Sequence, residues 1–508
     1  MVKRSGAAVF VMTMVASVLL ADSAVRAQDV DARDAEGATA LLRAVWNDDL
    51  AAVNALLAKG AQVSAANAVG ATPAYVAADN GNATILRRLL EAGADAATTD
   101  RSGDTLLMAA VRAGNLDAVQ VLLDHRAKVN DAEPAYGHTA LMWAVRRNDS
   151  AIMKLLLANG AAVDSKTRVG QKPEARPPGA GGGSHGVGIV RSGVPPQGEQ
   201  QPTPGGMTPL LFAARDGRLD AAKLLVEAGA DVNTADPNGI TPLVMALTNG
   251  QLPVAKFLIE HGADPRRADW WGRTPLWSAV DIRNLAARSG TSQHENGVDR
   301  DAAFEVITAL IDHGAAVNAR VGEFPPARRY LLPLGSLEWV DFTGQTPFIR
   351  AAQAADLPVM KLLVARGADP KLTTVHGTTA LMAAAGVNWV IGETYSESPA
   401  MWLQAVQFCL DQGLDVNAVN DMGLQAVHGA ANRGSDDIIE LLATHGAELN
   451  HADREGRTPY AWAQGVFLAT NSPVAKPSTM ALLDRLTNGS ASAAANKAEA
   501  AAAAEARR

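Results

Sequence analysis

The sequence has one cysteine, Cys409, among its 508 residues. A single thiol excludes an intramolecular disulfide, and it excludes zinc sites and c-type haem attachment that depend on a Cys-x-x-Cys pair. Aromatic residues are also scarce, at 5%, although 48% of the residues are hydrophobic and alanine is common among them. An apolar fraction made largely of small side chains favours a core of closely packed helices.

Long apolar runs are absent beyond the N-terminus, so no membrane span is predicted in the mature chain. Residues 1–27 combine a basic start, a 15-residue apolar run, and small residues at Val25 and Ala27. This layout predicts a signal peptide that is cleaved after Ala27. Export to a bacterial periplasm or to the medium is therefore expected, with an uncleaved membrane anchor as the alternative.

Positive charge is in the minority. The formal net charge is −8, and removal of residues 1–27 takes away three cations and one anion, which leaves about −10. An acidic chain is poorly matched to the phosphate backbone of nucleic acids, so we predict no nucleic-acid partner.

Glycines recur with a period of 33 residues, which indicates an internal repeat. Most spacings between them are 33, and the three long ones correspond to 33 plus an insertion. Each of these glycines precedes the start of a predicted helix by two residues. They are Gly37, Gly70, Gly103, Gly137, Gly206, Gly239, Gly272, Gly344, Gly377, Gly423 and Gly456.

The repeated unit is clearest in residues 236–265. Gly239 closes a tight turn, and Thr241 is predicted to cap a short helix that has Pro242 at its first position. A second helix follows, and Gly262 is predicted to end it in a left-handed conformation. Each unit is thus a turn followed by two helices, and neighbouring units must stack to bury their apolar faces.

This unit resembles the ankyrin repeat, whose signature includes Thr-Pro-Leu-His-x-Ala and a Gly-Ala pair after the second helix. Thr-Pro-Leu stands at residues 208–210, 241–243 and 274–276, whereas the signature histidine occurs only as His428. The resemblance covers residues 32–486. It implies an all-α solenoid of about eleven helix-turn-helix units with short β-type fingers, and a monomer is expected.

The repeats are interrupted in several places. We predict repeats 1–4 in residues 28–165, a Gly- and Pro-rich linker or loop at 166–205, and repeats 5–11 in 206–486. The linker lacks the Gly-Lys-Ser/Thr of a phosphate-binding loop. Insertions are predicted at 283–302, 321–340 and 386–402, and the Ala-rich tail 487–508 is expected to be disordered.

Histidines and carboxylates fall mostly at structural positions of the repeat, so no metal, cofactor or enzyme activity is predicted. His125, His261, His313 and His445 each stand at the end of a second helix, where a cation is favourable. Most carboxylates fall in turns, where they are expected to accept local hydrogen bonds. These include Asp34, Asp100, Asp236, Asp269, Asp341 and Asp453. A catalytic site, the least favoured alternative, would have to lie in the inserted loops around His294, Glu323, Trp389, Glu393 and Tyr395.

The resemblance implies a module that binds an unknown protein partner through its concave face and fingers. The alternative is an exported scaffold or chaperone-like protein without a single specific partner. Trp270 and Trp271 occupy the tip of one finger, where other units have mostly small or polar residues. Aromatic residues and arginine are typical of interface hot spots, so these positions are candidate contacts. The full candidate set is Trp270, Trp271, Tyr136, Phe342, Phe324, Arg328, Arg329, Tyr330 and Trp339. The other possibility is that the extended finger covers the two tryptophans in a local apolar cluster.

Overall fold

The computed structural model describes residues 30–170, 203–285, 298–322, 343–388, 397–466 and 473–496. These residues form helices joined by turns, and the β-bridges with both partners in the described part of the chain are Thr99–Thr105 and Ala132–Thr139. No helix in this part of the chain is long and apolar enough to cross a membrane. The expectation of an all-α repeat solenoid is confirmed. The predicted signal peptide, residues 1–27, lies outside the described residues.

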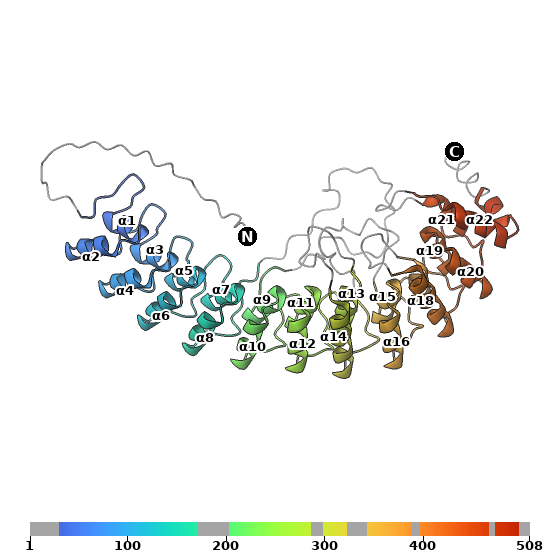
Figure 1. Ribbon diagram of the computed structural model, residues 1–508, viewed down its shortest axis with the longest axis horizontal. Coiled ribbons are helices and arrows are strands. Elements are labelled where there is room, and N and C mark those ends of the chain that lie inside the picture. The colour runs from blue at the N-terminus through green and yellow to red at the C-terminus, as the bar shows by residue number, and fades with distance from the viewer. Residues whose placement is uncertain are drawn as a thin grey trace.

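The helices alternate between an inner and an outer row (Figure 1). The inner helices are α1 Ala40–Trp46, α3 Pro73–Asp79, α5 Leu106–Ala113, α7 Ala140–Arg147, α9 Pro209–Asp216, α11 Pro242–Thr248, α13 Pro275–Arg283, α15 Pro347–Gln353, α17 Ala380–Ala385, α19 Ala426–Arg433 and α21 Pro459–Gly465. The outer helices are α2 Leu50–Ala58, α4 Ala83–Glu91, α6 Leu116–Asp124, α8 Ser150–Ala158, α10 Leu219–Glu227, α12 Leu252–Glu260, α14 Arg300–Asp312, α16 Leu357–Ala365, α18 Pro399–Asp411, α20 Asp436–Thr444 and α22 Pro477–Leu486.

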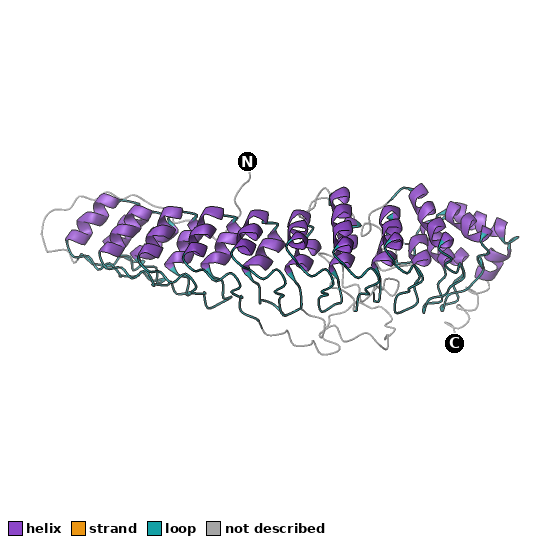
Figure 2. Cartoon of the chain, turned by 90° about the horizontal axis from the view of Figure 1, so that it is seen from below, coloured by secondary structure: helices purple, strands orange, loops and turns teal. Residues whose placement is uncertain are grey.

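Each inner helix packs against its own outer helix and against the inner helices on either side, from α1 to α22. The row is curved, with the inner helices along the concave side, and the turns between repeats project together from one side (Figures 1 and 2). One apolar core runs along the stack, from Leu41 near the start to Leu483 near the end. The molecule is therefore a single solenoid in which every repeat is stabilised by its neighbours.

The sequence of the repeat explains how each inner helix starts. Thr241 has extended backbone, its hydroxyl accepts a hydrogen bond from the Val244 N–H at 3.3 Å, and Pro242 follows at the first helical position. Ten of the eleven inner helices begin with such a threonine. The expected capping role is confirmed.

The turn carboxylates act as the sequence predicts. Asp236 accepts hydrogen bonds from the N–H groups of Asn238 at 2.9 Å and Ile240 at 2.8 Å, so one side chain closes the whole turn. In the same way, the backbone N–H groups of the second and fourth residues after the aspartate donate to its carboxylate at Asp34, Asp100, Asp269 and Asp453. Asp341 lies outside the described residues.

The histidines that end outer helices are also structural. At His125, His261 and His313 the ring Nδ1 lies 2.8 Å from the carbonyl oxygen four residues earlier, and at His445 this distance is 2.9 Å. Each ring thus donates to a carbonyl in the last turn of the helix, and at His125, His261 and His313 this carbonyl also accepts the backbone N–H of the histidine itself. No cluster of histidine, cysteine and carboxylate that could hold a metal ion occurs among the residues that the structure describes.

His428 is a buried histidine that joins two repeats. Its Nδ1 accepts a hydrogen bond from the Gln425 N–H at 3.0 Å, and its Nε2–H donates to the His451 carbonyl at 3.1 Å. Burial lowers the pKa of His428 to about 4, although the Asp453 carboxylate acts in the opposite direction. The ring is therefore neutral in the folded protein, where one nitrogen accepts a hydrogen bond and the other donates one.

Acid is expected to destabilise the repeat around His428. In the unfolded chain this histidine takes up a proton near pH 6.5, whereas the folded chain takes it up near pH 4. The neutral His428 ring makes its full contribution to the free energy of unfolding above pH 6.5. This contribution, about 3 kcal/mol, is lost as the pH falls towards 4. Urea unfolding at pH 7 and pH 4.5 measures the difference. The variant His428→Asn should lose less stability between these two pH values than the parent chain, and an equal loss would contradict the assignment.

The solenoid continues directly across the predicted linker. Helix α9 packs on α7 and α10 on α8, so repeats 4 and 5 stack as neighbours. The two ends of the segment also meet, because the Gly170 N–H donates to the Pro204 carbonyl at 2.8 Å and the Thr167 N–H donates to the Met207 carbonyl at 3.0 Å. Residues 171–202 themselves lie outside the described residues.

Deletion of residues 171–202, with two glycines as a replacement, is expected to leave the thermal midpoint within a few degrees of the parent. The ends already lie close together, and the entropy of loop closure changes only slowly with loop length. Differential scanning calorimetry provides the measurement. A drop of ten degrees or more would show that the segment contributes to packing.

Two of the predicted boundaries need correction. Helices extend into both ends of the predicted insertion 283–302, since α13 continues to Arg283 and α14 already begins at Arg300. The predicted insertion 386–402 likewise overlaps a helix, because α18 begins at Pro399. In the tail, residues 490–496 are helical, and Ala491 and Ala495 are buried. The prediction that the tail cannot pack was wrong for these residues, because alanine is small enough to fit closely against the last repeat.

Candidate functional site

The two adjacent tryptophans of the seventh finger have different environments. Trp270 is 43% exposed, whereas Trp271 is only 1% exposed. Their rings are in contact, with centroids 5.4 Å apart, and the Arg273 guanidinium lies 5.0 Å from the centre of the Trp271 ring. The candidate role of Trp271 as a partner contact is corrected, because this side chain is a core residue of the finger. Trp270 remains accessible.

The following finger explains why Trp271 is buried. The Gly322 N–H donates to the Trp271 carbonyl at 2.9 Å, so the chain of the next repeat crosses directly over the turn. Gly272 must be glycine at this crossing, since its φ is +75° and an added Cβ would lie 2.3 Å from the Gly322 nitrogen. Asp269 holds the base of the turn through a buried ion pair with Arg273 of 2.7 Å. Burial raises the pKa of Asp269, even though Arg273 acts in the opposite direction.

Of the other candidate contacts, the structure describes only Tyr136, which is 68% exposed at the tip of the fourth finger. The remaining six lie outside the described residues: Phe324, Arg328, Arg329, Tyr330, Trp339 and Phe342. Tyr136 lies far along the chain from the tryptophan pair. It belongs to a separate group of aromatic and arginine side chains.

This group forms a continuous stripe along four inner helices, and we call it the Trp143 stripe. The centre is Trp143 on α7, with the guanidinium carbons of Arg112 and Arg146 at 5.6 Å and 4.8 Å from its ring centre. The ring of His138 lies 5.4 Å from Trp143 and 5.8 Å from Phe212. The stripe consists of Tyr75, Arg112, Tyr136, His138, Trp143, Arg146, Phe212 and Arg215.

Polar contacts fix the stripe at Tyr75 on α3 and at His138 in the fourth finger. On α3, the Tyr75 hydroxyl accepts a hydrogen bond from Arg112 at 3.1 Å, and burial raises the pKa of Tyr75 to about 12. Near the fourth finger, His138 contacts the Glu133 carboxylate at 3.0 Å. Burial opposes the ionised form of Glu133, but hydrogen bonds from backbone N–H groups hold the pKa of its carboxyl below the usual value. The aromatic side chains are therefore held in place before any partner arrives.

The Trp143 stripe faces the open side of the curve. Within α7 the buried residues are those that contact other helices, and Trp143, Arg146 and Arg147 are the ones left on the remaining face. By contrast, every residue of α13 and of α15 is buried. The inner helices of repeats 7 and 8 are therefore covered, whereas α7 leaves the stripe residues Trp143 and Arg146 accessible. Phe212, at 4% exposed, is a buried member of the stripe.

Sequence reasoning missed most of the stripe, although the signal is present in the repeat alignment. Four residues after the capping threonine, about half of the repeats have small or aliphatic side chains. The fourth, fifth and eleventh have Trp143, Phe212 and Trp462, and the first and eighth have arginine. Three residues further on, the third, fourth and fifth repeats all have arginine: Arg112, Arg146 and Arg215. Aligning the inner face as well as the finger tips identifies this group.

A buried ionic cluster occupies the corresponding region of repeats 7 to 9, and we call it the Asp356 cluster. Asp356 is fully buried at the start of α16, and its carboxylate accepts hydrogen bonds from Arg283 at 2.8 Å and Asn284 at 3.0 Å. Arg300 lies 3.8 Å from the same carboxylate and pairs with Glu397 at 2.7 Å. The cluster therefore joins residues that precede α14, α16 and α18, and it links repeats 7 and 9 across repeat 8.

The Asp356 cluster continues into a second buried pair. Arg350 donates to Asp281 at 2.8 Å and to the Asn284 carbonyl at 3.2 Å. Burial raises the pKa of Glu397, and the nearby Asp356 carboxylate adds to this, although Arg300 and Arg283 act in the opposite direction. Three arginines and three carboxylates balance in charge, as buried ion clusters must. We interpret this cluster as structural.

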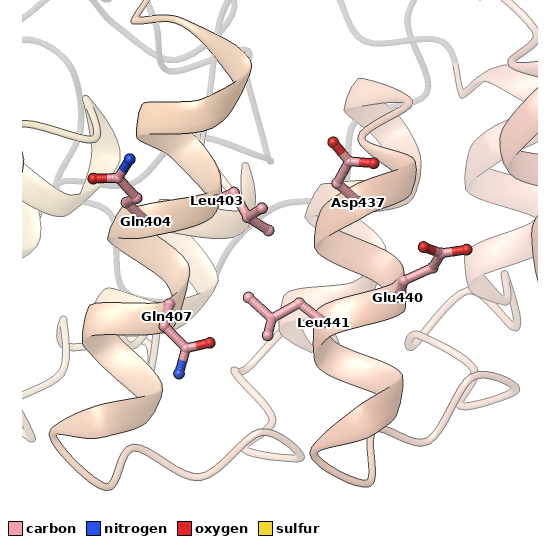
Figure 3. A pocket seen from close by; sticks show the side chains of 6 residues that line it. All are labelled: Leu403, Gln404, Gln407, Asp437, Glu440 and Leu441. Carbon is pink, nitrogen blue, oxygen red and sulfur yellow. The ribbon is translucent and has the colours of Figure 1, made fainter.

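The outer surface has one shallow groove of note, between α18 and α20. It is lined by Leu403, Gln404, Gln407, Asp437, Glu440 and Leu441 (Figure 3). The two leucines face one another between the helices, while Glu440 points away and pairs with Arg485 at 2.6 Å. Since neither carboxylate has a partner group suited to acid–base or nucleophilic chemistry in this groove, it is an ordinary seam between neighbouring outer helices.

Comparison with known proteins agrees with the repeat pattern. The family model described as ankyrin repeats (3 copies) matches residues 74–167, 189–269 and 210–287. The model of the single ankyrin repeat matches residues 343–375.

Two curated relatives are similar to part of the chain. The chain is 31% identical over 133 residues to the probable 26S proteasome regulatory subunit p28 of Saccharomyces cerevisiae, which covers 25% of this chain and 53% of that protein. It is 33% identical over 134 residues to the B-cell lymphoma 3 protein homolog of Mus musculus, which covers 25% of this chain and 28% of that protein. The chain thus spans about half the length of the first relative and about a quarter of the second.

A solved structure, that of the ankyrin repeat domain of Bcl-3, is also similar. It is 24% identical in sequence, with a TM-score of 0.40, and the match covers 54% of this chain and 99% of that one.

Proposed function

Because this chain is an ankyrin-repeat protein, we propose that it is a binding module whose protein partner docks on the Trp143 stripe. The observation that carries the proposal is the stripe itself: tryptophan, tyrosine and arginine side chains, pre-arranged in mutual contact, on the accessible part of the inner surface. These residue types dominate the binding energy at protein interfaces.

The physical argument is one of pre-organisation. A side chain that is already held by its neighbours loses little conformational freedom when a partner binds, so more of the contact energy appears as affinity. Trp143 is packed between two guanidinium groups, and His138 bridges it to Phe212. Tyr136, which projects at the finger tip, extends the same surface outward.

Affinity capture from an envelope extract tests the proposal, with the purified chain on the resin. The double variant Tyr136→Ala with Trp143→Ala is expected to weaken capture of a stoichiometric partner by about 2 kcal/mol, roughly thirtyfold. Trp46→Ala is a matched control, because Trp46 is 68% exposed on α1 and lies outside the stripe. Equal capture by both variants and the parent, at equal folded fraction, would overturn the proposal. Diffuse capture of many proteins would favour the scaffold or chaperone-like alternative.

We further propose that the chain is exported and acts outside the cytoplasm, as residues 1–27 suggest. The mature protein is expected to begin at Gln28, since cleavage follows the small residue Ala27. N-terminal sequencing of the protein from cell fractions measures this directly. A membrane-embedded species that retains Met1 would contradict cleavage.

A further inference from the structure

One junction of the solenoid is built differently from the others. Along the described stack each outer helix packs on the next one, from α2 on α4 to α20 on α22, except at α14 and α16. The backbones of these two helices make little close contact, although their inner helices α13 and α15 pack in the usual way. The junction between repeats 7 and 8 therefore lacks, on its outer side, the interlocked helix packing that resists bending elsewhere.

Buried ion pairs cross this junction on its inner side. Arg283 of repeat 7 pairs with Asp356 of repeat 8 at 2.8 Å, and Arg350 of repeat 8 pairs with Asp281 of repeat 7 at the same distance. At other junctions the ion pairs between neighbouring repeats are surface contacts, such as that of Lys256 with Glu305 at 3.1 Å. Charge thus takes over part of the role that packing has elsewhere.

The outer side of the junction is also held by polar groups. Arg366, which follows α16, pairs with Asp312 at the end of α14, and both side chains are accessible to solvent. Below them the Asn318 side chain donates to the Gly367 carbonyl at 3.2 Å, as Asn233 donates to the corresponding carbonyl one repeat earlier. These contacts join the ends of the two helices and leave their length without close packing.

The Asp356 cluster reaches beyond the junction. Arg300, the first residue of α14, pairs with Glu397 at 2.7 Å, and Glu397 precedes α18 of repeat 9. Arg300 also lies 3.8 Å from Asp356. Repeat 8 is therefore connected by charge to repeat 7 directly, and repeat 7 is connected to repeat 9 as well.

We infer that the junction between repeats 7 and 8 is a hinge of the solenoid and that the Asp356 cluster locks it. We call repeats 1–7 the N-terminal arm and repeats 8–11 the C-terminal arm. Within each arm every outer helix packs on its neighbour, so each arm moves as one body. The packed inner helices α13 and α15 form the axis, so movement at this junction changes the curvature of the concave side.

The lock depends on charge balance. When a carboxylate of the cluster loses its charge, an arginine is left buried without its partner, which is costly. The arginine regains hydration if the two arms move apart on the outer side, and no outer-helix packing opposes this movement. The Trp143 stripe lies entirely on the N-terminal arm, so the hinge does not depend on the proposed function.

Double electron–electron resonance between two spin labels tests the inference on the full-length mature chain. The hinge pair has cysteines at Glu260 on α12 and Gln404 on α18, and it spans three junctions, including the one between repeats 7 and 8. The control pair, at Arg87 on α4 and Lys223 on α10, spans three junctions of the N-terminal arm. Native Cys409 stays unlabelled because it is fully buried, and burial raises the pKa of its thiol.

Asp356→Asn removes the central charge and keeps the shape of the side chain. In this variant we expect the hinge-pair distance to shift or broaden by about 3 Å or more, the diameter of the water that the released arginine needs. The control pair should not change. Glu397→Gln, which breaks only the pair with Arg300, should act in the same direction to a smaller extent, and it decides the question if Asp356→Asn does not fold. Glu440→Gln is the matched control, because it breaks a surface pair with Arg485 inside the C-terminal arm.

Three results would overturn the inference. The first is an unchanged hinge-pair distance in the folded variants of the cluster. The second is an equal change in the hinge and control pairs, which would show general loosening of the stack. The third is an equal effect of Glu440→Gln, which would show that the cluster has no special role. Circular dichroism of each labelled variant checks that it is folded.

Discussion

Replacement of Asp356 by alanine is expected to lower the free energy of unfolding by about 3–5 kcal/mol, because it leaves buried charges without their partner. The Asp356 side chain is fully buried, and it neutralises Arg283 and lies within 3.8 Å of Arg300. Arg283 has no other carboxylate within ion-pair distance among the described residues, whereas Arg300 keeps its pair with Glu397 at 2.7 Å. Loss of this carboxylate therefore costs much more than the loss of a surface ion pair.

The repeat supplies a matched control for this variant. In repeats 1–4 the residue before the outer helix caps that helix locally, as Asp149 does by accepting a hydrogen bond from the Ile152 N–H at 3.1 Å. Asp356 makes no such bond with its own helix, because its carboxylate points into the ionic cluster. Asp149→Ala should cost about 1 kcal/mol, the usual value of a lost helix cap.

Native-state hydrogen exchange is the suitable measurement, since a long repeat array does not unfold in one step. In Asp356→Ala, protection should fall for amides of α14, α16 and α18 together, because the cluster joins the beginnings of all three helices. In Asp149→Ala, the loss should be confined to α8 and its immediate neighbours. Equal and local losses in the two variants would show that the cluster is no more than an ordinary cap.

The repeat itself was predictable because its signals are local. A threonine cap, a proline one residue later and a turn carboxylate all act within about four residues, so the sequence pattern states them directly. The period of 33 then gives the stacking order, because each unit needs neighbours to cover its apolar face. The same reasoning predicted the structural role of histidines such as His261.

The features that were missed depend on contacts between residues far apart in the chain. Arg283 and Asp356 are 73 positions apart, and an insertion separates the repeats that hold them. Nothing in the local pattern distinguishes Asp356 from a capping residue such as Asp149. The Trp143 stripe is intermediate, since its members lie about one repeat apart and the alignment of the inner face would have placed them together.

The tryptophan pair shows the same limit at the level of one finger. The repeat alignment gives Trp270 and Trp271 equivalent positions at a tip. The second tip position is exposed in some fingers, as at Tyr136, and buried in others, as at Asn238. What separates the two tryptophans is the chain near Gly322, about one and a half repeats later, which crosses over the turn. The fate of each side chain was therefore decided by a segment that no local signal connects to it.

Truncation of the two tryptophans should accordingly have very different effects. Trp271→Ala is expected to destabilise the protein by about 3–5 kcal/mol, because it removes a large, fully buried ring and leaves a cavity beside the buried Asp269–Arg273 pair. Arg273 also loses the ring over which it lies at 5.0 Å. Trp270→Ala should cost less than about 1 kcal/mol, since its ring is 43% exposed.

Thermal unfolding and hydrogen exchange of the two single variants separate these effects, and each serves as the control for the other. In Trp271→Ala the exchange should accelerate at amides of the seventh finger and at Gly322, which donates to the Trp271 carbonyl. Partner capture by this variant should follow its folded fraction and nothing more, because the proposed binding surface lies over α3 to α9. A selective loss of capture at unchanged stability would restore Trp271 as a partner contact and would move the binding surface to the C-terminal half of the solenoid.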